Sequence, residues 1–276
     1  MSETYRSLLR LNQLPHVWCP GCGNGTIVKA LLDAIGQLGL EQDKVVVVSG
    51  IGCAGRTPFV LDFNTMHTTH GRALAFATGI KLANPSLHVI VVMGDGDASA
   101  IGGNHFIHAC RRNLELTALI FNNGIYGLTG GQLAPTTPAG KRSTTSLAGS
   151  IEPAFDLVRL ALGAGAGFVA RTTSFDHKQM TSYFKKAITF NGFSVVDVIT
   201  SCPTYFGRMN DVSEPYDMVH YLRDTTAPMH EGVCDEEPPA AAVMSTGVFR
   251  EEPRPDYLSL YREKVAAATA GKRSGL

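Results

Sequence analysis

The stretch from Leu87 to Gly131 constrains the fold of this chain more than any other part of its sequence. A first apolar run leads into Gly94-Asp95-Gly96, a helical segment follows, and a second apolar run ends at Asn122-Asn123. About 25 residues separate the two polar ends, which suits a turn, a helix and a return strand. We therefore expect both ends to lie side by side at the carboxyl edge of a parallel sheet, where open α/β sheets bind ligands.

The residue types at this edge predict a diphosphate held by Mg²⁺. The glycines of Gly94-Asp95-Gly96 let the backbone approach a bulky anion, and a helix that opens at Asp97 presents unpaired N–H groups to phosphate oxygens. The side chains of Asp95 and Asn123 and the carbonyl of Ile125 are hard oxygen ligands of the kind that Mg²⁺ prefers. Gly-Asp-Gly alone is an ordinary turn after a strand, so the prediction depends on its spacing to Asn-Asn. The alternative is a βαβ unit with polar turns and no ligand.

Composition and charge narrow the class of protein. The length of 276 residues suits one large α/β domain with appendages. The 24 basic and 24 acidic residues balance, and no run of like charge is long enough to make nucleic acid an expected partner. No apolar segment reaches the ~18 residues of a membrane span, and the first residues lack the basic start and apolar core of a secretory signal. We therefore expect a cytoplasmic protein that does not bind membranes.

Four of the six cysteines are placed to meet at the same sheet edge. Cys19 and Cys22 form a Cys-x-x-Cys pair, which in a reducing compartment is more often a metal or redox site than a disulfide. Cys53 and Cys202 each follow an apolar run that reads as a strand. Four converging thiolates suit either zinc or an iron–sulfur cluster, and sequence alone does not separate the two by geometry. The proline after Cys202 slightly favours the cluster.

Other candidate residues carry weaker signals. Cys110 lies within a helical segment and is expected to be a small buried apolar residue, while Cys234 stays unassigned. His70 opens a helix and could hydrogen-bond the diphosphate or the reacting carbonyl, which makes it a possible catalytic residue. His105 and His108 are expected to lie on a packed helix face rather than to bind metal, because no third ligand is apparent nearby.

Six motifs occur in order over about residues 15–210. They are Cys19-Pro-Gly-Cys22-Gly, Gly50-Ile-Gly-Cys53-Ala-Gly-Arg56, His70-Gly-Arg72-Ala-Leu-Ala-Phe-Ala-Thr-Gly79, Gly94-Asp-Gly96-Asp, Asn122-Asn-Gly-Ile-Tyr-Gly-Leu-Thr129 and Cys202-Pro203. The pair of Gly-Asp-Gly and Asn-Asn resembles the thiamine diphosphate motif of thiamine-dependent enzymes. Together the six motifs resemble the β subunit of 2-oxoacid:ferredoxin oxidoreductases, and most closely that of the 2-oxoglutarate enzyme.

The resemblance implies a set of ligands. The ligands of a [4Fe–4S] cluster would be Cys19, Cys22, Cys53 and Cys202. The ligands of Mg²⁺ would be Asp95, Asn123 and Ile125. The residues expected around thiamine diphosphate are Gly52, Cys53, His70, Gly71, Gly94, Asp95, Gly96, Asp97, Asn123, Ile125, Gly127, Leu128 and Thr129.

The resemblance also implies a reaction. The C2 carbanion of the cofactor would attack the carbonyl of a 2-oxoacid, CO₂ would leave, and the cluster would pass two electrons singly to ferredoxin. Coenzyme A would receive the acyl group, which gives succinyl-CoA if the substrate is 2-oxoglutarate. Pyruvate or a branched-chain or broader set of 2-oxoacids is the alternative, because Gly130 occupies a position where relatives often carry Lys.

The sequence lacks one part of a complete thiamine enzyme, and this predicts a partner subunit. Thiamine enzymes activate the aminopyrimidine with a Glu, and no Glu in this sequence falls within a recognisable pyrimidine-binding domain. An α subunit should supply that domain, in an (αβ)₂ assembly with the cofactor at the interface. Two rival classes are a non-redox thiamine diphosphate decarboxylase or carboligase and a zinc-stabilised binding module without catalysis.

The alternation of apolar runs with helical periodicity predicts an open, mostly parallel sheet flanked by helices. Residues 1–223 would form the thiamine diphosphate and iron–sulfur domain, and residues 224–276 an irregular C-terminal arm. Residues 130–149 would form a loop long enough to be functional. The predicted helices span 24–38, 73–83, 154–162, 176–190 and 256–268, and a further helix opens at Asp97.

Overall fold

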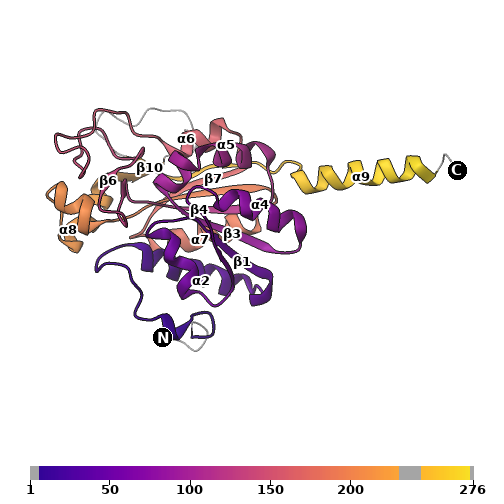
Figure 1. The fold of residues 1–276 in the computed structure, drawn as a ribbon, viewed down its shortest axis with the longest axis horizontal. Coiled ribbons are helices and arrows are strands. Elements are labelled where there is room, and N and C mark those ends of the chain that lie inside the picture. The colour runs from indigo at the N-terminus through magenta and orange to yellow at the C-terminus, as the bar shows by residue number, and fades with distance from the viewer. Residues whose placement is uncertain (1–5, 230–243, 274–276) are drawn as a thin grey trace.

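The computed structural model describes residues 6–229 and 244–273, whose main feature is an eight-stranded sheet flanked by helices (Figure 1). The strands lie in the order β2-β1-β3-β4-β8-β7-β10-β9, and β5 and β6 form a separate hairpin. Their bounds are β1 Val45–Ser49, β2 Asn64–His67, β3 His88–Gly94, β4 Leu116–Asn122, β5 Ile125–Tyr126, β6 Gln132–Leu133, β7 Phe168–Thr173, β8 Phe193–Ile199, β9 Thr226–Pro228 and β10 Met244–Glu251.

The helices connect these strands across both faces of the sheet. The α-helices are α2 Asn24–Leu38, α3 Thr57–Val60, α4 Ala73–Ala83, α5 Gly103–Arg112, α6 Leu157–Gly163, α7 His177–Thr189, α8 Pro215–Asp224 and α9 Tyr257–Arg273. Short 3₁₀ turns span Leu11–Gln13, Gln42–Lys44 and Ala54–Arg56, and π-helical turns span Asp97–Ile101 and Pro203–Gly207.

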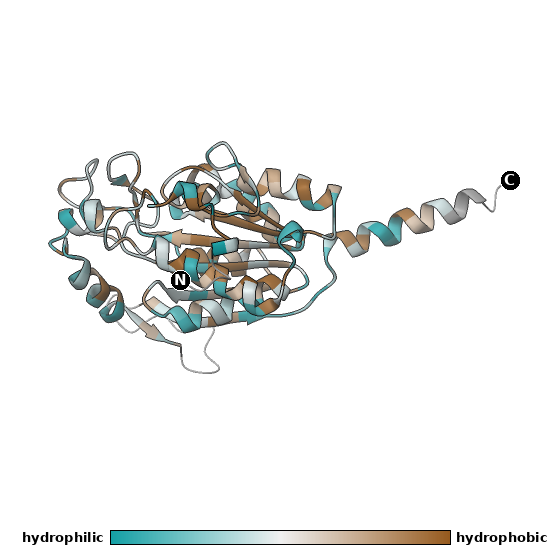
Figure 2. Cartoon of the chain, turned by 90° about the horizontal axis from the view of Figure 1, so that it is seen from below, coloured by the Kyte–Doolittle hydropathy of each residue, from teal (hydrophilic) through white to brown (hydrophobic). Residues whose placement is uncertain are grey.

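Two apolar cores fill the space between the sheet and its helical layers. Helices α2 and α7 cover one face, where Leu31 and Phe184 are buried. Helices α4, α5 and α6 cover the other, where Phe106 and Leu157 are buried. The central strands β1 and β4 are buried along their whole length, which explains why their sequences are continuous apolar runs. Figure 2 shows the hydrophobic residues concentrated in the central strands.

The strand order creates a switch point at the carboxyl edge of the sheet. β1 pairs in parallel with β2 on one side and with β3 on the other, so the chain leaves β1 in one direction and returns beyond it. Loops on the two sides of such a point diverge and leave a crevice in which ligands bind. The loops after β1 and β3 carry Cys53 and Gly94-Asp95-Gly96. The fold therefore opens a crevice at the predicted site.

Most of the predicted elements are confirmed. The sheet is mostly parallel, α2 and α4 begin and end at the predicted residues, and α6 and α7 differ from the prediction by a few residues. The helix predicted at Asp97 differs in kind, because its first turn is π-helical and α5 begins only at Gly103. A Cβ at Gly102 would lie 2.2 Å from the carbonyl oxygen of Asp97. This wide turn thus depends on a close contact that periodicity does not reveal.

The segment after Arg223 is more regular than predicted. β10 pairs antiparallel with β7 and in parallel with β9, so the prediction of an irregular arm is wrong for residues 226–228 and 244–251. β10 lies between β7 and the edge strand β9 and is only partly buried, and its sequence therefore lacks the apolar run that marks the central strands. The boundary after residue 223 stays a prediction, and Cys234 lies outside the described residues. α9 is longer than predicted and projects from the body of the molecule (Figure 1).

No helix within residues 6–229 or 244–273 is long and apolar enough to cross a membrane.

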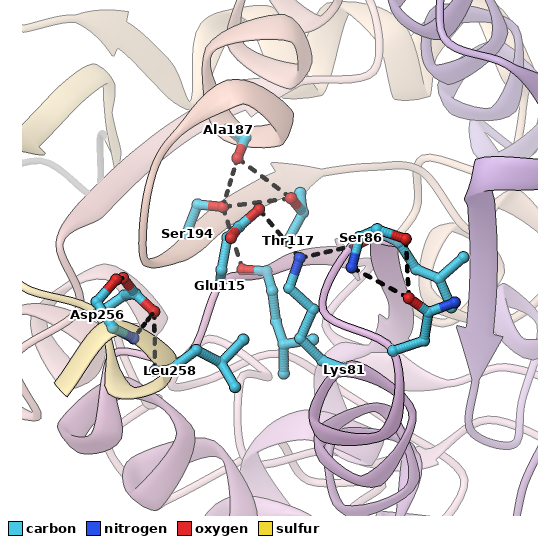
Figure 3. Close-up of polar contacts among 12 residues, drawn as sticks. Lys81, Ser86, Glu115, Thr117, Ala187, Ser194, Asp256 and Leu258 are labelled. Atoms are coloured by element: carbon cyan, nitrogen blue, oxygen red, sulfur yellow. Dashed lines mark hydrogen bonds and ion pairs between the residues drawn. The ribbon is translucent and has the colours of Figure 1, made fainter. Parts of the chain in front are cut away.

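Buried polar contacts tie the helices to the amino edge of the sheet, opposite the crevice (Figure 3). Lys81 of α4 has a fully buried side chain whose Nζ lies 3.0 Å from Glu115 Oε1 and donates to the carbonyl of Leu87 at 2.8 Å. Because Leu87 and Glu115 precede β3 and β4, this ion pair joins one helix to two strands. The hydroxyls of Thr117 and Ser194 likewise donate to the carbonyl of Ala187, at 3.2 and 2.7 Å.

The ion pair between Lys81 and Glu115 should contribute measurably to stability. Glu115→Ala should lower the free energy of unfolding by roughly 2 kcal/mol, because it leaves a buried ammonium without its carboxylate. Lys81→Met should cost less than about 1 kcal/mol, since it fills the same space without a charge. Urea unfolding of the purified protein measures both changes.

A half-exposed pair serves as the control. Lys186 and Glu251 lie 2.8 Å apart with 46% of each side chain exposed, so Lys186→Ala should cost less than about 1 kcal/mol. An equal cost for Glu115→Ala and Lys186→Ala would contradict the role given to burial.

Candidate active site

A cavity of about 120 Å³ lies at the carboxyl ends of β1, β3 and β4. All the residues predicted around the cofactor line it, with the exception of Gly71. The backbone N–H of Gly71 instead donates to Asp97 Oδ1 at 2.6 Å, behind the cavity wall. The structure therefore brings the predicted residues together, while their contact with a cofactor stays a prediction.

Five residues that line this cavity lie outside the set predicted from the sequence. They are Asn24, Ile51, Ala54, Phe121 and Tyr126. Four of them adjoin or lie within the motifs that predicted the site, so extending each motif by a residue would have found them. Asn24 comes from the start of α2, which no local signal connects to the diphosphate motif. Its buried side-chain amide has no hydrogen-bond partner among the described residues.

Asp95 is the buried acid of this cavity, with 2% of its surface exposed. Burial raises the pKa of its carboxyl to about 6, although hydrogen bonds from the Thr136 hydroxyl and the backbone N–H of Asn123 oppose the increase. An acid buried in this way gains from a bound cation. Asn123 and Ile125 line the same cavity and offer further oxygen atoms. This donor set fits Mg²⁺.

The four predicted cysteines come together beside the cavity. Cys53 lines it, and a Cβ on Gly127 would lie 3.5 Å from the sulfurs of both Cys53 and Cys202. Burial, and to a smaller extent repulsion from the thiolates of Cys53, Cys202 and Cys19, raises the pKa of Cys22 to about 12. Burial in the same way raises the pKa of Cys53 to about 11. Thiols held like this ionise only when a metal stabilises the thiolates.

Hydrogen bonds and close packing hold the loop that carries Cys19 and Cys22. The indole of Trp18 donates to the carbonyl of Cys53 at 2.8 Å, and the hydroxyl of Ser201 donates to the carbonyl of Gly21 at 2.9 Å. A Cβ on Gly23 would lie 2.1 Å from the hydroxyl oxygen of Thr200. The loop can therefore reach the end of β8 only because glycine occupies position 23.

The spacing of the thiols bears on the choice between zinc and a cluster. Within the part of the chain that the structure describes, no three His, Cys, Asp or Glu side chains are close enough to hold one metal ion. Thiolates on a single zinc ion all lie about 2.3 Å from it, whereas those of a four-iron cluster can bind separate irons and stand further apart. A four-iron cluster therefore accepts a wider arrangement of thiolates than a single zinc ion does.

The remaining candidate residues have structural contacts. Cys110 is fully buried in the core, as predicted. His105 contacts Arg72, and His108 accepts a hydrogen bond from Arg111 Nε at 3.3 Å. The two histidines thus make separate contacts, and neither lines the cavity.

A second, larger cavity of about 490 Å³ lies between the Asn122–Gly124 turn and α8. Of the predicted site residues it contains only Asn123. The smaller cavity is therefore the candidate active site.

Comparison with known proteins agrees with this geometry. Residues 50–198 match the family model of the thiamine pyrophosphate enzyme C-terminal TPP binding domain. Over 252 residues the chain is 50% identical to the 2-oxoglutarate synthase subunit KorB of Archaeoglobus fulgidus, with 91% of each chain covered. Over 211 residues it is 48% identical to the 2-oxoacid:ferredoxin oxidoreductase subunit beta of Saccharolobus solfataricus, covering 75% of this chain and 68% of that one.

The chain belongs to the β subunits of the 2-oxoacid:ferredoxin oxidoreductases. The predicted family and fold class are thereby confirmed. A solved structure supports this, since the 2-oxoglutarate:ferredoxin oxidoreductase of Magnetococcus marinus superposes with a TM-score of 0.82 at 33% identity. The match covers 92% of this chain and 88% of that one, and the solved enzyme has 2-oxoglutarate, coenzyme A and succinyl-CoA bound.

The burial of Asp95 in this β subunit should lower the stability of the cofactor-free fold and favour cofactor binding. Its raised pKa favours the folded state at low pH, and this contribution is lost as pH rises through about 6. At pH 8 the ionised carboxylate should destabilise the cofactor-free protein by roughly 3 kcal/mol. Asp95→Asn should therefore raise the free energy of unfolding by about 1–2 kcal/mol, while it weakens binding of Mg²⁺ and thiamine diphosphate.

Urea unfolding of the cofactor-free protein at several pH values tests this prediction. The gain from Asp95→Asn should be largest at pH 8 and should shrink as pH falls from 6 towards 4. A variant that is less stable than the wild-type protein at pH 8 would show that Asp95 serves the fold rather than a cation.

Proposed function

We propose that this chain is the β subunit of a 2-oxoglutarate:ferredoxin oxidoreductase. In the reaction 2-oxoglutarate, coenzyme A and two oxidised ferredoxins give succinyl-CoA, CO₂, a proton and two reduced ferredoxins. One observation carries the proposal. Cys53 and Gly127 line the cavity that holds Asp95, and both also border the cluster of four cysteines, Cys19, Cys22, Cys53 and Cys202. An oxidoreductase needs its electron acceptor beside the reacting carbon, and a simple decarboxylase does not.

Thiamine diphosphate and Mg²⁺ would occupy the cavity. Asp95, Asn123 and the carbonyl of Ile125 would hold the metal, and the backbone around Gly94 and Gly96 would approach the diphosphate. A Cβ on Gly96 would lie 2.3 Å from the ring of Tyr126, so glycine is required there. When bound, the thiazolium ring supplies the electron sink for decarboxylation. The unpartnered amide of Asn24 gains hydrogen bonds from a ligand in this cavity.

A [4Fe–4S] cluster on Cys19, Cys22, Cys53 and Cys202 would supply the one-electron step. Burial opposes ionisation of Cys22 and Cys53, and positively charged irons offset that cost. Cys202 lies at the start of a π-turn, where the backbone N–H groups of Phe206 and Tyr205 stabilise its thiolate although burial raises its pKa. Amide N–H groups aimed at sulfur are one of the means by which proteins set the potential of a cluster.

The preference for 2-oxoglutarate depends on the relatives rather than on a single side chain. Gly130 occupies the position where relatives often carry Lys. Its φ is +119°, which a residue with a side chain rarely adopts. The backbone conformation of this loop therefore favours glycine over Lys at position 130. Another group must then bind the distal carboxylate of 2-oxoglutarate. The KorB relatives and the solved enzyme of Magnetococcus marinus carry 2-oxoglutarate in their names, which favours that substrate over pyruvate.

The β subunit needs an α subunit to complete the site. Among the described residues the acids that line the cavity are Asp95 and Asp97, and no Glu is present to activate an aminopyrimidine. α9 supports an assembly, because it projects from the body of the molecule and leaves Leu260, Tyr261 and Val265 about half exposed, an apolar surface that a partner would cover. We expect an (αβ)₂ enzyme with ferredoxin as electron acceptor, in the cytoplasm, where thiols stay reduced.

Replacing a cluster ligand should remove iron. Each of Cys19→Ser, Cys22→Ser, Cys53→Ser and Cys202→Ser should lower the iron content and the visible absorbance of the purified complex, because a hydroxyl is a poor ligand for iron in such clusters. Cys110→Ser is the matched control, since it alters a buried cysteine that is not one of these four. It should lower the stability of the fold through poorer packing and leave the iron content unchanged. Full iron content in all four ligand variants would contradict the assignment.

The isolated chain should be inactive. Reconstituted with Mg²⁺ and thiamine diphosphate, it should reduce a viologen dye with 2-oxoglutarate and coenzyme A at least about 100-fold more slowly than the complex, because half of the site is missing. Comparable rates for chain and complex would contradict the shared site. Dye reduction with pyruvate in place of 2-oxoglutarate checks the substrate in the same assay.

A further inference from the structure

The charges around the cavity are unbalanced for an anionic ligand. Among the described residues that line it, Asp95 and Asp97 are acidic, His70 is the only basic one, and none is Lys or Arg. The terminal phosphate of a diphosphate carries about −1.5 to −2 charges near neutral pH. Mg²⁺ bound at Asp95 would offset only part of this, and His70 is the basic side chain among these residues that can add a hydrogen bond to the phosphate.

His70 is held in one orientation. Its Nδ1 lies 2.5 Å from Asp97 Oδ1, the same oxygen that accepts the backbone N–H of Gly71 at 2.6 Å. Because a carboxylate oxygen accepts, Nδ1 of His70 must carry the hydrogen. The ring stands edge-on to Tyr126 with 6.2 Å between ring centres, and the side chain is 33% exposed at the cavity. Nε2 is therefore the ring nitrogen that remains for a ligand.

The position of Asp97 is built by residues on other elements. Its side chain is 1% exposed and packs against Gly50, where a Cβ would lie 1.9 Å from Asp97 Oδ2. Glycine at position 50 therefore makes room for the acid. Asp97 Oδ2 has no hydrogen-bond partner within the described chain, so burial of this acid is a cost to the fold. A buried acid that is tolerated at such a cost points to a role in the site.

We propose that Asp97 is a positioning residue that turns His70 so that its Nε2 faces and hydrogen-bonds a phosphate group in the cavity. This rests on the proposed function, in which that phosphate belongs to thiamine diphosphate. Asp97 contacts Nδ1 of the ring, the phosphate would contact Nε2, and the ring of Tyr126 stands edge-on to the imidazole. His70 is then a residue that binds the cofactor, and not the base or acid that acts on the oxoacid carbonyl.

Binding measurements on the complex of this chain with its partner subunit, stripped of cofactor, test the assignment without any turnover. The ligands are thiamine diphosphate and pyrophosphate, each with Mg²⁺, and thiamine, which lacks the diphosphate. His70→Ala should weaken binding of the first two by about 10–100-fold, the loss of one charge-assisted hydrogen bond. Binding of thiamine should stay within a factor of about two.

Two further variants separate positioning from contact. Asp97→Asn keeps the shape of the acid but removes its charge, and should weaken the two diphosphate ligands by about 5–10-fold. Gly50→Ala displaces Asp97 from behind without altering either partner, and should act in the same direction. If Gly50→Ala lowers the melting temperature of the complex, the near-isosteric Asp97→Asn still decides the matter. His108→Ala, on α5 outside the cavity, is the control and should bind all three ligands normally.

The possible failures are distinguishable. If His70→Ala weakens thiamine as much as thiamine diphosphate, the ring shapes the cavity and does not bind phosphate, which overturns the inference. Wild-type affinity for both diphosphate ligands in His70→Ala would also overturn it, and loss of turnover in that variant would then assign His70 to the reacting carbonyl. Failure of the wild-type complex to bind either diphosphate ligand would overturn the proposed function itself, and this inference with it.

Discussion

Burial of groups that must ionise is the constraint on which the rest of this structure depends. Asp95 sits at the carboxyl edge of the sheet with its pKa raised to about 6, and the thiols of Cys22 and Cys53 stand beside it with pKa values near 12 and 11. In each case loss of solvent is the largest cause. Carboxylates and thiolates held in this way repel one another and favour bound cations. The site is therefore incomplete as a bare polypeptide, and its metals would be part of its stability.

The fold separates the carboxyl edge of the sheet, where buried polar groups lack partners, from the amino edge, where they have them. At the amino edge the buried ammonium of Lys81 has a carboxylate and a carbonyl as partners, and the hydroxyls of Thr117 and Ser194 share the carbonyl of Ala187. At the carboxyl edge the amide of Asn24 and one oxygen of Asp97 lack partners among the described residues. A rigid amino edge thus supports an opposite edge whose polar groups await ligands, which is the usual division in open α/β sheets.

Glycines let the pieces of this site approach one another. Gly23 meets Thr200, Gly50 meets Asp97, and Gly96 meets Tyr126, all at distances that a side chain would not allow. Gly127 stands between the sulfurs of Cys53 and Cys202. Gly127 therefore lines the acidic cavity and at the same time lies close to two of the four cysteine sulfurs.

The sequence by itself determined the elements whose signals are local. Continuous apolar runs predicted β1, β3 and β4, helical spacing predicted α2 and α4 to the residue, and the distance from Gly94-Asp95-Gly96 to Asn123 predicted one edge for all of them. These features depend on neighbours a few residues apart or on the regular geometry of a βαβ unit.

Only the tertiary structure decided the rest. It brought β10 into the sheet, widened the turn after Asp97, paired Asp97 with His70 in the space left by Gly50, and gathered four cysteines from distant segments beside one cavity. Each of these outcomes depends on contacts between segments distant in the chain. Their energies come from burial and close packing, which leave no periodic pattern in the amino-acid sequence.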